Sequence, residues 1–274
     1  MKRLLFPLIF LFATTAITAQ VKQLKKVSSL QMARNVDDDM PGTRGAAVAW
    51  HPIQKKYFAS MAGNQQYPLG IFDESGKRLS ADEQNCLQDV RGLWFNPTKK
   101  AIQGNCFGEG GWFIYKLDEE GIVYKAEVIV EGMNQPTDQS VGSYHSGLNK
   151  VIFIDIDSVY FYNSATGVKE KSIFLRLGQK KKATTANSDA APVENMPDNY
   201  NSSTIICTGI KGSELGLLNI DKKQIELYNI ADGYMTTILG LPEETAVESS
   251  FNFAYCNNIY WLFNIEKRTW LGFK

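Results

Sequence analysis

Three carboxylates in this chain occupy positions that could support catalysis. Asp89, Asp138 and Glu248 each lie one to three residues before a short apolar segment. Glycoside hydrolysis requires two carboxyl groups held about 5–10 Å apart. No local motif marks any of the three as catalytic, so a carboxylate-based glycosidase or lyase is the alternative hypothesis here and not the leading one.

The two histidines of the chain occupy equivalent positions in a repeated pattern. His51 lies in "VAWHPIQKKYFAS" (48–60), and "WFNPTKKAIQGN" (94–105) places Asn96 at the matching position. Both segments have an aromatic residue, a polar residue and a proline, followed by a polar turn with two lysines. His145 takes the same place in a third repeat. A shared repeat position indicates a structural role in a turn and not a catalytic base or a metal ligand.

The four cysteines form no C-x-x-C pair, which argues against zinc and thioredoxin-like sites. We expect mostly buried, small apolar residues. If a disulfide forms, Cys86 with Cys106 is favoured because the two are close in sequence, and the other pairings stay open. The run "NVDDDM" (35–40) has adjacent and not alternating aspartates, so it matches a calcium loop poorly. We expect no metal and no cofactor.

A second repeated element indicates how the chain is organised. Four segments end an apolar or aromatic run in Asp or Asn and then close a turn with glycine: "GIFDESGK", "IYKLDEEGI", "YFYNSATGV" and "ELYNIADGY". Their glycines, Gly76, Gly121, Gly167 and Gly233, are spaced by 45, 46 and 66 residues. The long interval contains a polar segment at about 178–199 that reads as a flexible loop. Without its 22 residues the interval is 44, so the period is regular.

A period near 45 residues built from short strand-like runs predicts a β-propeller with one four-stranded blade per repeat. We expect an all-β fold of five antiparallel blades over residues 20–274, with six blades as the alternative. The fifth repeat stops at Lys274 before its fourth strand. The spare segment "VKQLKKVSSLQM" (21–32) is expected to supply that strand and so close the ring.

These segments resemble the repeats of WD-repeat and YVTN-type propellers. In those families an aromatic residue, a polar–proline pair and a lysine-containing turn precede the second strand, and an Asp or Asn turn with glycine follows the third. The Trp-Asp dipeptide and Gly-His pair of true WD repeats are absent. The resemblance therefore implies an architecture and no activity. It places the turns between strands one and two, and three and four, on one face, and the remaining loops on the other.

The first 19 residues have the pattern of a secretory signal peptide. Lys2 and Arg3 precede the apolar run "LLFPLIFLFA", and small and polar residues follow up to Ala19. We therefore expect a periplasmic or extracellular protein without membrane insertion. Without the leader the chain has 27 basic and 29 acidic residues. This near-neutral charge argues against a nucleic-acid partner.

The loop-rich face is expected to carry the function, because binding residues concentrate on variable loops held by a rigid scaffold. Residues just before each inner strand would line the channel mouth there: Arg44, Asp89, Arg91, Asp138 and Glu248. Aromatic surface could come from Tyr67, Phe107 and Trp112. We expect a monomeric, non-catalytic binding or scaffold module for a protein or a glycan, and the alternative is the glycosidase or lyase at the same mouth.

Overall fold

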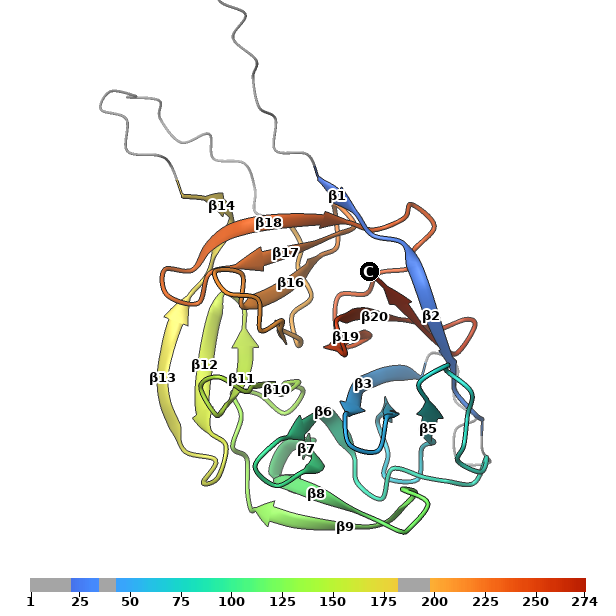
Figure 1. Cartoon of the computed structure of the whole chain (residues 1–274). Helices are drawn as coiled ribbons and strands as arrows, with labels where there is room; N and C mark the ends of the chain where they lie inside the picture. Colours follow the sequence, from blue (N-terminus) through green and yellow to red (C-terminus); the bar gives the residue numbers. More distant parts are fainter. Residues whose placement is uncertain (1–20, 35–42, 182–197) are drawn as a thin grey trace, which may run out of the picture.

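A computed structural model describes residues 21–34, 43–181 and 198–274 of the chain. Figure 1 shows five small sheets arranged around a central axis, each with its first strand innermost. The protein is therefore an all-β, five-bladed β-propeller with antiparallel blades, and the six-blade alternative is excluded. The helical structure in the described ranges is one 3-10 turn, Gly108–Gly110.

Blades two to four follow the predicted repeat closely. Blade two contains β6 (Val90–Asn96), β7 (Ala101–Cys106), β8 (Trp112–Leu117) and β9 (Val123–Val130). Blade three contains β10 (Ser143–His145), β11 (Lys150–Asp155), β12 (Ser158–Asn163) and β13 (Lys169–Phe174). Blade four contains β15 (Ile206–Cys207), β16 (Leu215–Asn219), β17 (Gln224–Tyr228) and β18 (Tyr234–Gly240).

Burial within a blade falls from the middle strands to the outer strand. The four central residues of β11 are buried, because neighbouring blades pack against both faces of the sheet. The outer strand β13 is exposed at nearly every position. The middle strands are accordingly apolar runs such as "VIFI", whereas the outer strands β9 and β13 carry lysine and glutamate, residues that discourage pairing with a second chain.

The glycines that set the predicted period close the turns between third and fourth strands. Their φ angles are +88° at Gly76, +71° at Gly121, +69° at Gly167 and +71° at Gly233, a region that side chains disfavour. The preceding Asp or Asn accepts from the turn backbone, as when Asn163 Oδ1 accepts from Ala165 N at 3.0 Å. The repeated glycines therefore mark the positions at which the turn backbone needs a positive φ angle.

The first blade departs from the prediction at its fourth strand. Its sheet holds β3 (Arg44–His51), β4 (Lys56–Ala62) and β5 (Leu69–Asp73), and the fourth strand that the repeat predicts after Gly76 is reduced to a bridge between Phe72 and Arg78. Ile71 N donates to the Ser80 hydroxyl at 3.1 Å. A side chain therefore replaces a backbone acceptor there, and the ladder ends.

The N-terminal segment closes the ring as expected. Blade five contains β19 (Phe253–Cys256), β20 (Ile259–Asn264) and β21 (Thr269–Phe273), and β2 (Lys26–Gln31) pairs antiparallel with β21 as the fourth strand. An unexpected second contact precedes it: β1 (Lys22–Gln23) pairs in parallel with β18 of blade four. The same short segment therefore joins two blades, and Figure 1 shows it crossing between them.

Blade four has a further strand on its outer edge. The segment β14 (Arg176–Lys180) pairs in parallel with β18. Tyr200 forms a bridge with Asn219. The two ends of the segment expected as a loop at 178–199 are therefore attached to blade four, and residues 182–197 lie outside the described residues.

The inner strands of blades two and three lie close together at a pair of glycines. A Cβ atom at Gly92 would lie 2.6 Å from both the backbone N and O of Gly142. Since no real Cβ atom tolerates that distance, glycine at both inner-strand positions allows the two backbones to pack side by side.

Candidate functional site

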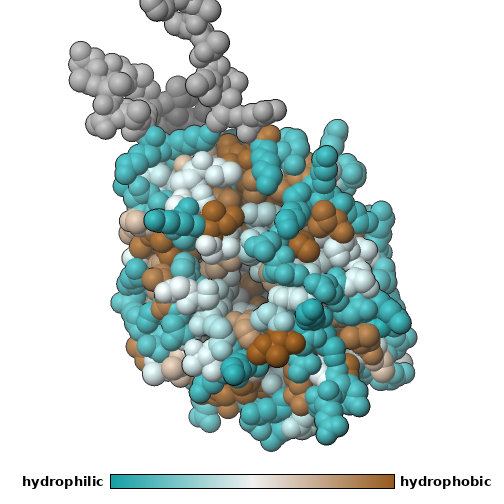
Figure 2. Space-filling model, in the orientation of Figure 1, coloured by the Kyte–Doolittle hydropathy of each residue, from teal (hydrophilic) through white to brown (hydrophobic). Residues whose placement is uncertain are grey.

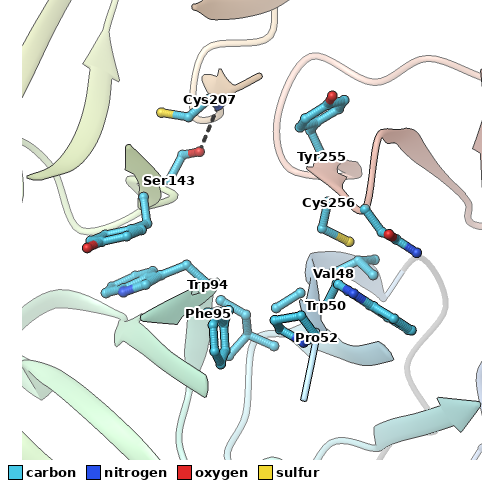
Figure 3. Close-up of a pocket in the computed structure, with 13 residues that line it drawn as sticks. Val48, Trp50, Pro52, Trp94, Phe95, Ser143, Cys207, Tyr255 and Cys256 are labelled. Atoms are coloured by element: carbon cyan, nitrogen blue, oxygen red, sulfur yellow. Dashed lines mark hydrogen bonds between the residues drawn. The ribbon is translucent and has the colours of Figure 1, made fainter. Parts of the chain in front are cut away.

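A cavity of about 200 Å³ lies on the axis of the propeller, where the inner strands end. All five blades contribute to its wall. The lining residues are Val48, Ala49, Trp50, Pro52, Leu93, Trp94, Phe95, Ser143, Tyr144, Cys207, Tyr255, Cys256 and Asn257. Figure 3 shows the labelled side chains surrounding a common space, and Figure 2 shows the surface hollowed near its centre.

The aromatic lining follows from one repeat position. The residue immediately before each first-turn residue faces the cavity: Trp50, Phe95, Tyr144, Cys207 and Tyr255. Inner strands run roughly along the axis, so equivalent positions form a layer around it. Four of these five residues are aromatic. The sequence therefore contains a signal for this site, one position upstream of the repeated turn residues such as His51 and Asn96.

The cavity has few polar groups and no charged side chain in its lining. Ser143 Oγ accepts from Cys207 N at 3.0 Å, which leaves the hydroxyl hydrogen available to a ligand. Asn257 Nδ2 donates to Tyr57 at 2.7 Å, which leaves its carbonyl oxygen as an acceptor. The site thus offers flat apolar rings together with a hydroxyl donor and an amide acceptor.

The two thiols in the lining have little nucleophilic character. Burial raises the pKa of the Cys207 thiol to about 12, and burial also raises the pKa of Cys256. Since the thiolate is the reactive form, neither residue is suited to attack a substrate at neutral pH. Both contribute soft apolar surface.

The histidines have the structural role that their repeat position indicated. His51 Nδ1 accepts from Gln54 N, and His145 Nδ1 accepts from Leu148 N, each at 3.2 Å. Asn96 Oδ1 accepts from Thr98 N at 3.0 Å in the matching turn. Burial lowers the pKa of both imidazoles, which favours the neutral form that can accept at Nδ1.

The opposite mouth of the channel holds most of the residues that the sequence pointed to. Arg91 is buried, its Nη1 lies 2.5 Å from Asp89 Oδ1, and its Nε donates to Gln139 at 2.8 Å. The guanidinium also lies over the rings of Phe107 and Phe251, 4.8 Å and 5.6 Å from their centroids. Arg91 therefore holds together segments from blades two, three and five, and its part in ligand binding stays a prediction.

The carboxylates considered for catalysis differ in surroundings. Asp89 is paired with Arg91, Asp138 is exposed, and the contact described for Glu248 runs through its backbone oxygen, which accepts from Asn201. None of the three lines the central cavity. Arg44, also exposed, donates from Nη1 to Ser250 Oγ at 2.5 Å.

Two of the aromatic residues expected at a binding surface are part of the packing. Trp112 is fully buried, so it adds no surface. It packs against Trp94, Phe153 and Tyr162, because β8 faces blade three. Tyr67 is half-buried against the core between blades one and five.

All four cysteines are thiols in the structure. Cys86 Sγ donates to Pro68 O at 3.4 Å, and Cys106 Sγ donates to Gln88 Oε1 at 3.5 Å. Both lie in the same apolar cluster of blades one and two. Their pairing stays a prediction.

Over the described ranges, no group of three or more His, Cys, Asp or Glu side chains is arranged to hold a metal ion. Asp37, Asp38 and Asp39 lie outside those ranges. Among residues 21–34, 43–181 and 198–274, no helix has the length and apolar character needed to cross a membrane.

Fold and site together define a β-propeller with an aromatic cavity on its axis. Among solved structures, the chain is similar to Myxococcus xanthus glutaminyl cyclase, with a TM-score of 0.56 and 10% identity, over 92% of this chain and 96% of that one. A chain of a nidogen/laminin complex has a TM-score of 0.42 and 9% sequence identity, and the match covers 74% of this chain and 65% of that one. A Bacteroides caccae protein of unknown function has a TM-score of 0.40 and 10% sequence identity, and the match covers 73% of this chain and 62% of that one.

No protein-family model and no curated protein sequence matches this chain. The likeness to the cyclase is at a sequence identity that shows a shared fold alone. The resemblance to WD-repeat and YVTN-type proteins is likewise supported as a propeller architecture and not as membership of either family.

Proposed function

We propose that the protein is an exported, non-catalytic binding propeller whose central cavity holds a neutral sugar residue of a glycan. The observation that carries the proposal is the lining of that cavity. Aromatic rings from blades one, two, three and five surround it, with a hydroxyl and an amide and without a charged side chain. Ligand sites commonly combine an apolar wall with a few placed polar groups.

The size and polarity of the cavity favour a single sugar ring. Its volume of about 200 Å³ is below the roughly 300–1,000 Å³ of sites for drug-sized ligands. The C–H face of a pyranose packs on aromatic rings, and its hydroxyls can bond Ser143 Oγ and Asn257 Oδ1. An acidic sugar would leave its carboxylate without a cation, which is costly in a partly dry site.

Binding is favoured over catalysis because the lining supplies neither a carboxylate nor an imidazole, the groups that most often serve as general acids and bases. The carboxylate-based glycosidase or lyase remains the weaker candidate. The Asp89 carboxylate is already paired with the Arg91 guanidinium, and within the part of the chain that the structure describes no contact joins the side chains of Asp138 and Glu248. Nothing in the cavity independently supports the cyclase activity for which the Myxococcus protein is named.

The loop-rich face stays a candidate surface for a protein partner, as part of the same binding or scaffold role. Export is supported by the pattern of the first 19 residues. A pulldown from the envelope fraction of the native cell would identify such a partner, and recovery of glycan alone would favour the central cavity as the working site.

Tryptophan fluorescence gives a direct test of the cavity. Of the five tryptophans, Trp50 is half-buried in the lining and the other four are buried. Neutral hexose and N-acetylhexosamine oligosaccharides should shift the emission and protect it from acrylamide quenching. In calorimetry, Trp50→Ala should weaken the best oligosaccharide about fivefold, since one aromatic contact contributes ~1 kcal/mol.

Phe174→Ala is the matched control, because this ring is 70% exposed on the outer strand β13. It should bind like the wild type. Tyr144→Ala provides a second lining variant in case Trp50→Ala unfolds. The proposal would be wrong if no neutral oligosaccharide binds the folded protein, or if the lining variants and Phe174→Ala lose affinity equally.

A further inference from the structure

The central cavity narrows sharply along the axis of the propeller. A second cavity of about 20 Å³ lies next to it and shares Val48, Leu93, Ser143 and Tyr255 with its lining. The rest of that lining comes from earlier positions of the same inner segments, which lie deeper in the ring. A space of this size holds about one water molecule, so a sugar ring that fills the central cavity cannot pass beyond it.

Packed backbone keeps the narrow part closed. Gly142 lines it, and a Cβ atom at Gly92 of the neighbouring blade would lie 2.6 Å from the Gly142 backbone. Thr204 and Phe253, from blades four and five, also line it and are buried. Since the backbones of blades two and three are already in contact, the passage cannot widen unless the blades separate.

Side chains also fill the far side of the narrow part, at the opposite mouth of the channel. There the buried Arg91 guanidinium lies over the rings of Phe107 and Phe251. It also donates to Gln139, which belongs to the link between blades two and three. The described residues therefore block the axis between the two faces of the propeller.

The wall of the central cavity is closed sideways as well. Each inner strand contacts the next one around the ring: β3 with β6, β6 with β10, β10 with β15, β15 with β19, and β19 with β3. Figure 3 shows the labelled side chains of these strands surrounding one space. The cavity is therefore a pit whose opening lies at the turns that contain Pro52 and Asn257.

We propose that the central cavity receives only the end residue of a glycan chain. The inference rests on the proposed function, because it takes a neutral sugar as the ligand. A terminal residue has one linkage, which can point out through the opening of the pit. An internal residue has a neighbour on each side, and both neighbours would have to leave through that same opening. The protein therefore recognises the ends of a glycan and not its internal residues.

The test compares linear oligosaccharides with forms of them whose ends are blocked. Hexasaccharides of glucose, N-acetylglucosamine, mannose and galactose are the parent probes. Borohydride reduction opens the ring at the reducing end, and a benzylidene acetal covers the ring at the other end. In calorimetry on the folded protein, the doubly blocked form should bind at least about tenfold more weakly than its parent, a loss of about 1.4 kcal/mol. At least one singly blocked form should bind within about twofold of the parent, because one free end is enough.

Protein variants assign this end-dependent binding to the central cavity. Trp50→Ala, or Tyr144→Ala if that variant does not fold, should lower the affinity for the parent, and Phe174→Ala should not. The inference is overturned, and the proposed function kept, if the doubly blocked form binds as tightly as its parent. It is also overturned if the lining variants bind the parent like the wild type, since the end would then bind elsewhere. If none of the parents binds, the proposed function fails together with the inference.

Discussion

At the scale of single residues, the inner strands of blades one to four end in two neighbouring positions with different roles. One residue faces the axis and lines the cavity, as Trp50 does. The next accepts a backbone hydrogen bond in the turn, as His51 does. This division explains why a histidine beside the cavity is not part of its chemistry, and why Asn96 can replace histidine in blade two.

The pH dependence of stability should report the buried histidines. Burial lowers the pKa of His51 below its ordinary value, so the unfolded chain takes up a proton more readily than the folded protein. The free energy of unfolding is therefore greatest above about pH 6.5 and decreases as the pH falls. His51→Asn keeps an acceptor for Gln54 N and removes the titration.

Urea denaturation of wild type and His51→Asn at pH 7.5 and pH 5 measures this effect. The two proteins should be similar at pH 7.5, and the variant should lose less stability on acidification. Adding His145→Asn should reduce the loss further, because burial also lowers the pKa of that imidazole. Identical losses in all three proteins would contradict the assignment.

At the scale of elements, blade four differs from the others because it holds a buried carboxylate. Glu226 on β17 is 1% exposed and accepts from Tyr228 OH at 2.5 Å and Tyr200 OH at 2.9 Å. Asn219 and Gln224 donate to its second oxygen. Tyr228 OH in turn accepts from Gly178 N at 3.2 Å. One side chain thus fixes both chain segments that flank residues 182–197.

Replacing Glu226 should weaken blade four. In Glu226→Gln, one carboxylate oxygen that accepts hydrogen bonds is replaced by an NH₂ group, which faces donors and cannot accept from them. Leaving a buried donor without an acceptor costs about 1–3 kcal/mol. Urea denaturation should show that loss. Glu244→Gln, at an exposed position, is the matched control and should change stability by less than about 0.5 kcal/mol. Equal values for the two variants would argue against this role.

At the scale of the whole molecule, the ring depends on a segment from the start of the domain. The strand β2 completes blade five, and β1 lies along blade four. Without them, β21 would be an open edge able to pair with another chain. Removing residues 21–32 should therefore unfold or aggregate the protein, as light scattering and thermal denaturation would show. A monomeric truncation with an unchanged melting temperature would disprove this closure.

Point variants in β2 separate packing from simple loss of chain. Leu30 is fully buried and Val27 is 53% exposed in the same strand. Leu30→Ala should cost about 2–5 kcal/mol of unfolding free energy. Val27→Ala should cost less than about 0.5 kcal/mol. Similar values for the two would mean that β2 is not packed as a blade strand.

Most of the architecture could be predicted because it is encoded locally. Turn glycines such as Gly121 and Gly167 need positive φ angles, and the aromatic and β-branched runs between them form strands whatever lies across the ring. The exception is the fourth strand of blade one. There the Ser80 hydroxyl takes the place of a backbone acceptor, a contact that the pattern of residue types does not reveal.

The sequence by itself therefore predicted five blades with six as the alternative, the order of the strands in blades two to five, and the structural role of the histidines. Only the tertiary structure decided which positions line the central cavity and which pack in the core. Trp112 became core because blade three covers it, and Arg91 became a link between blades because Phe251 reaches it from the far end of the chain. Such contacts join residues that are far apart in sequence, so no local sequence pattern could predict them.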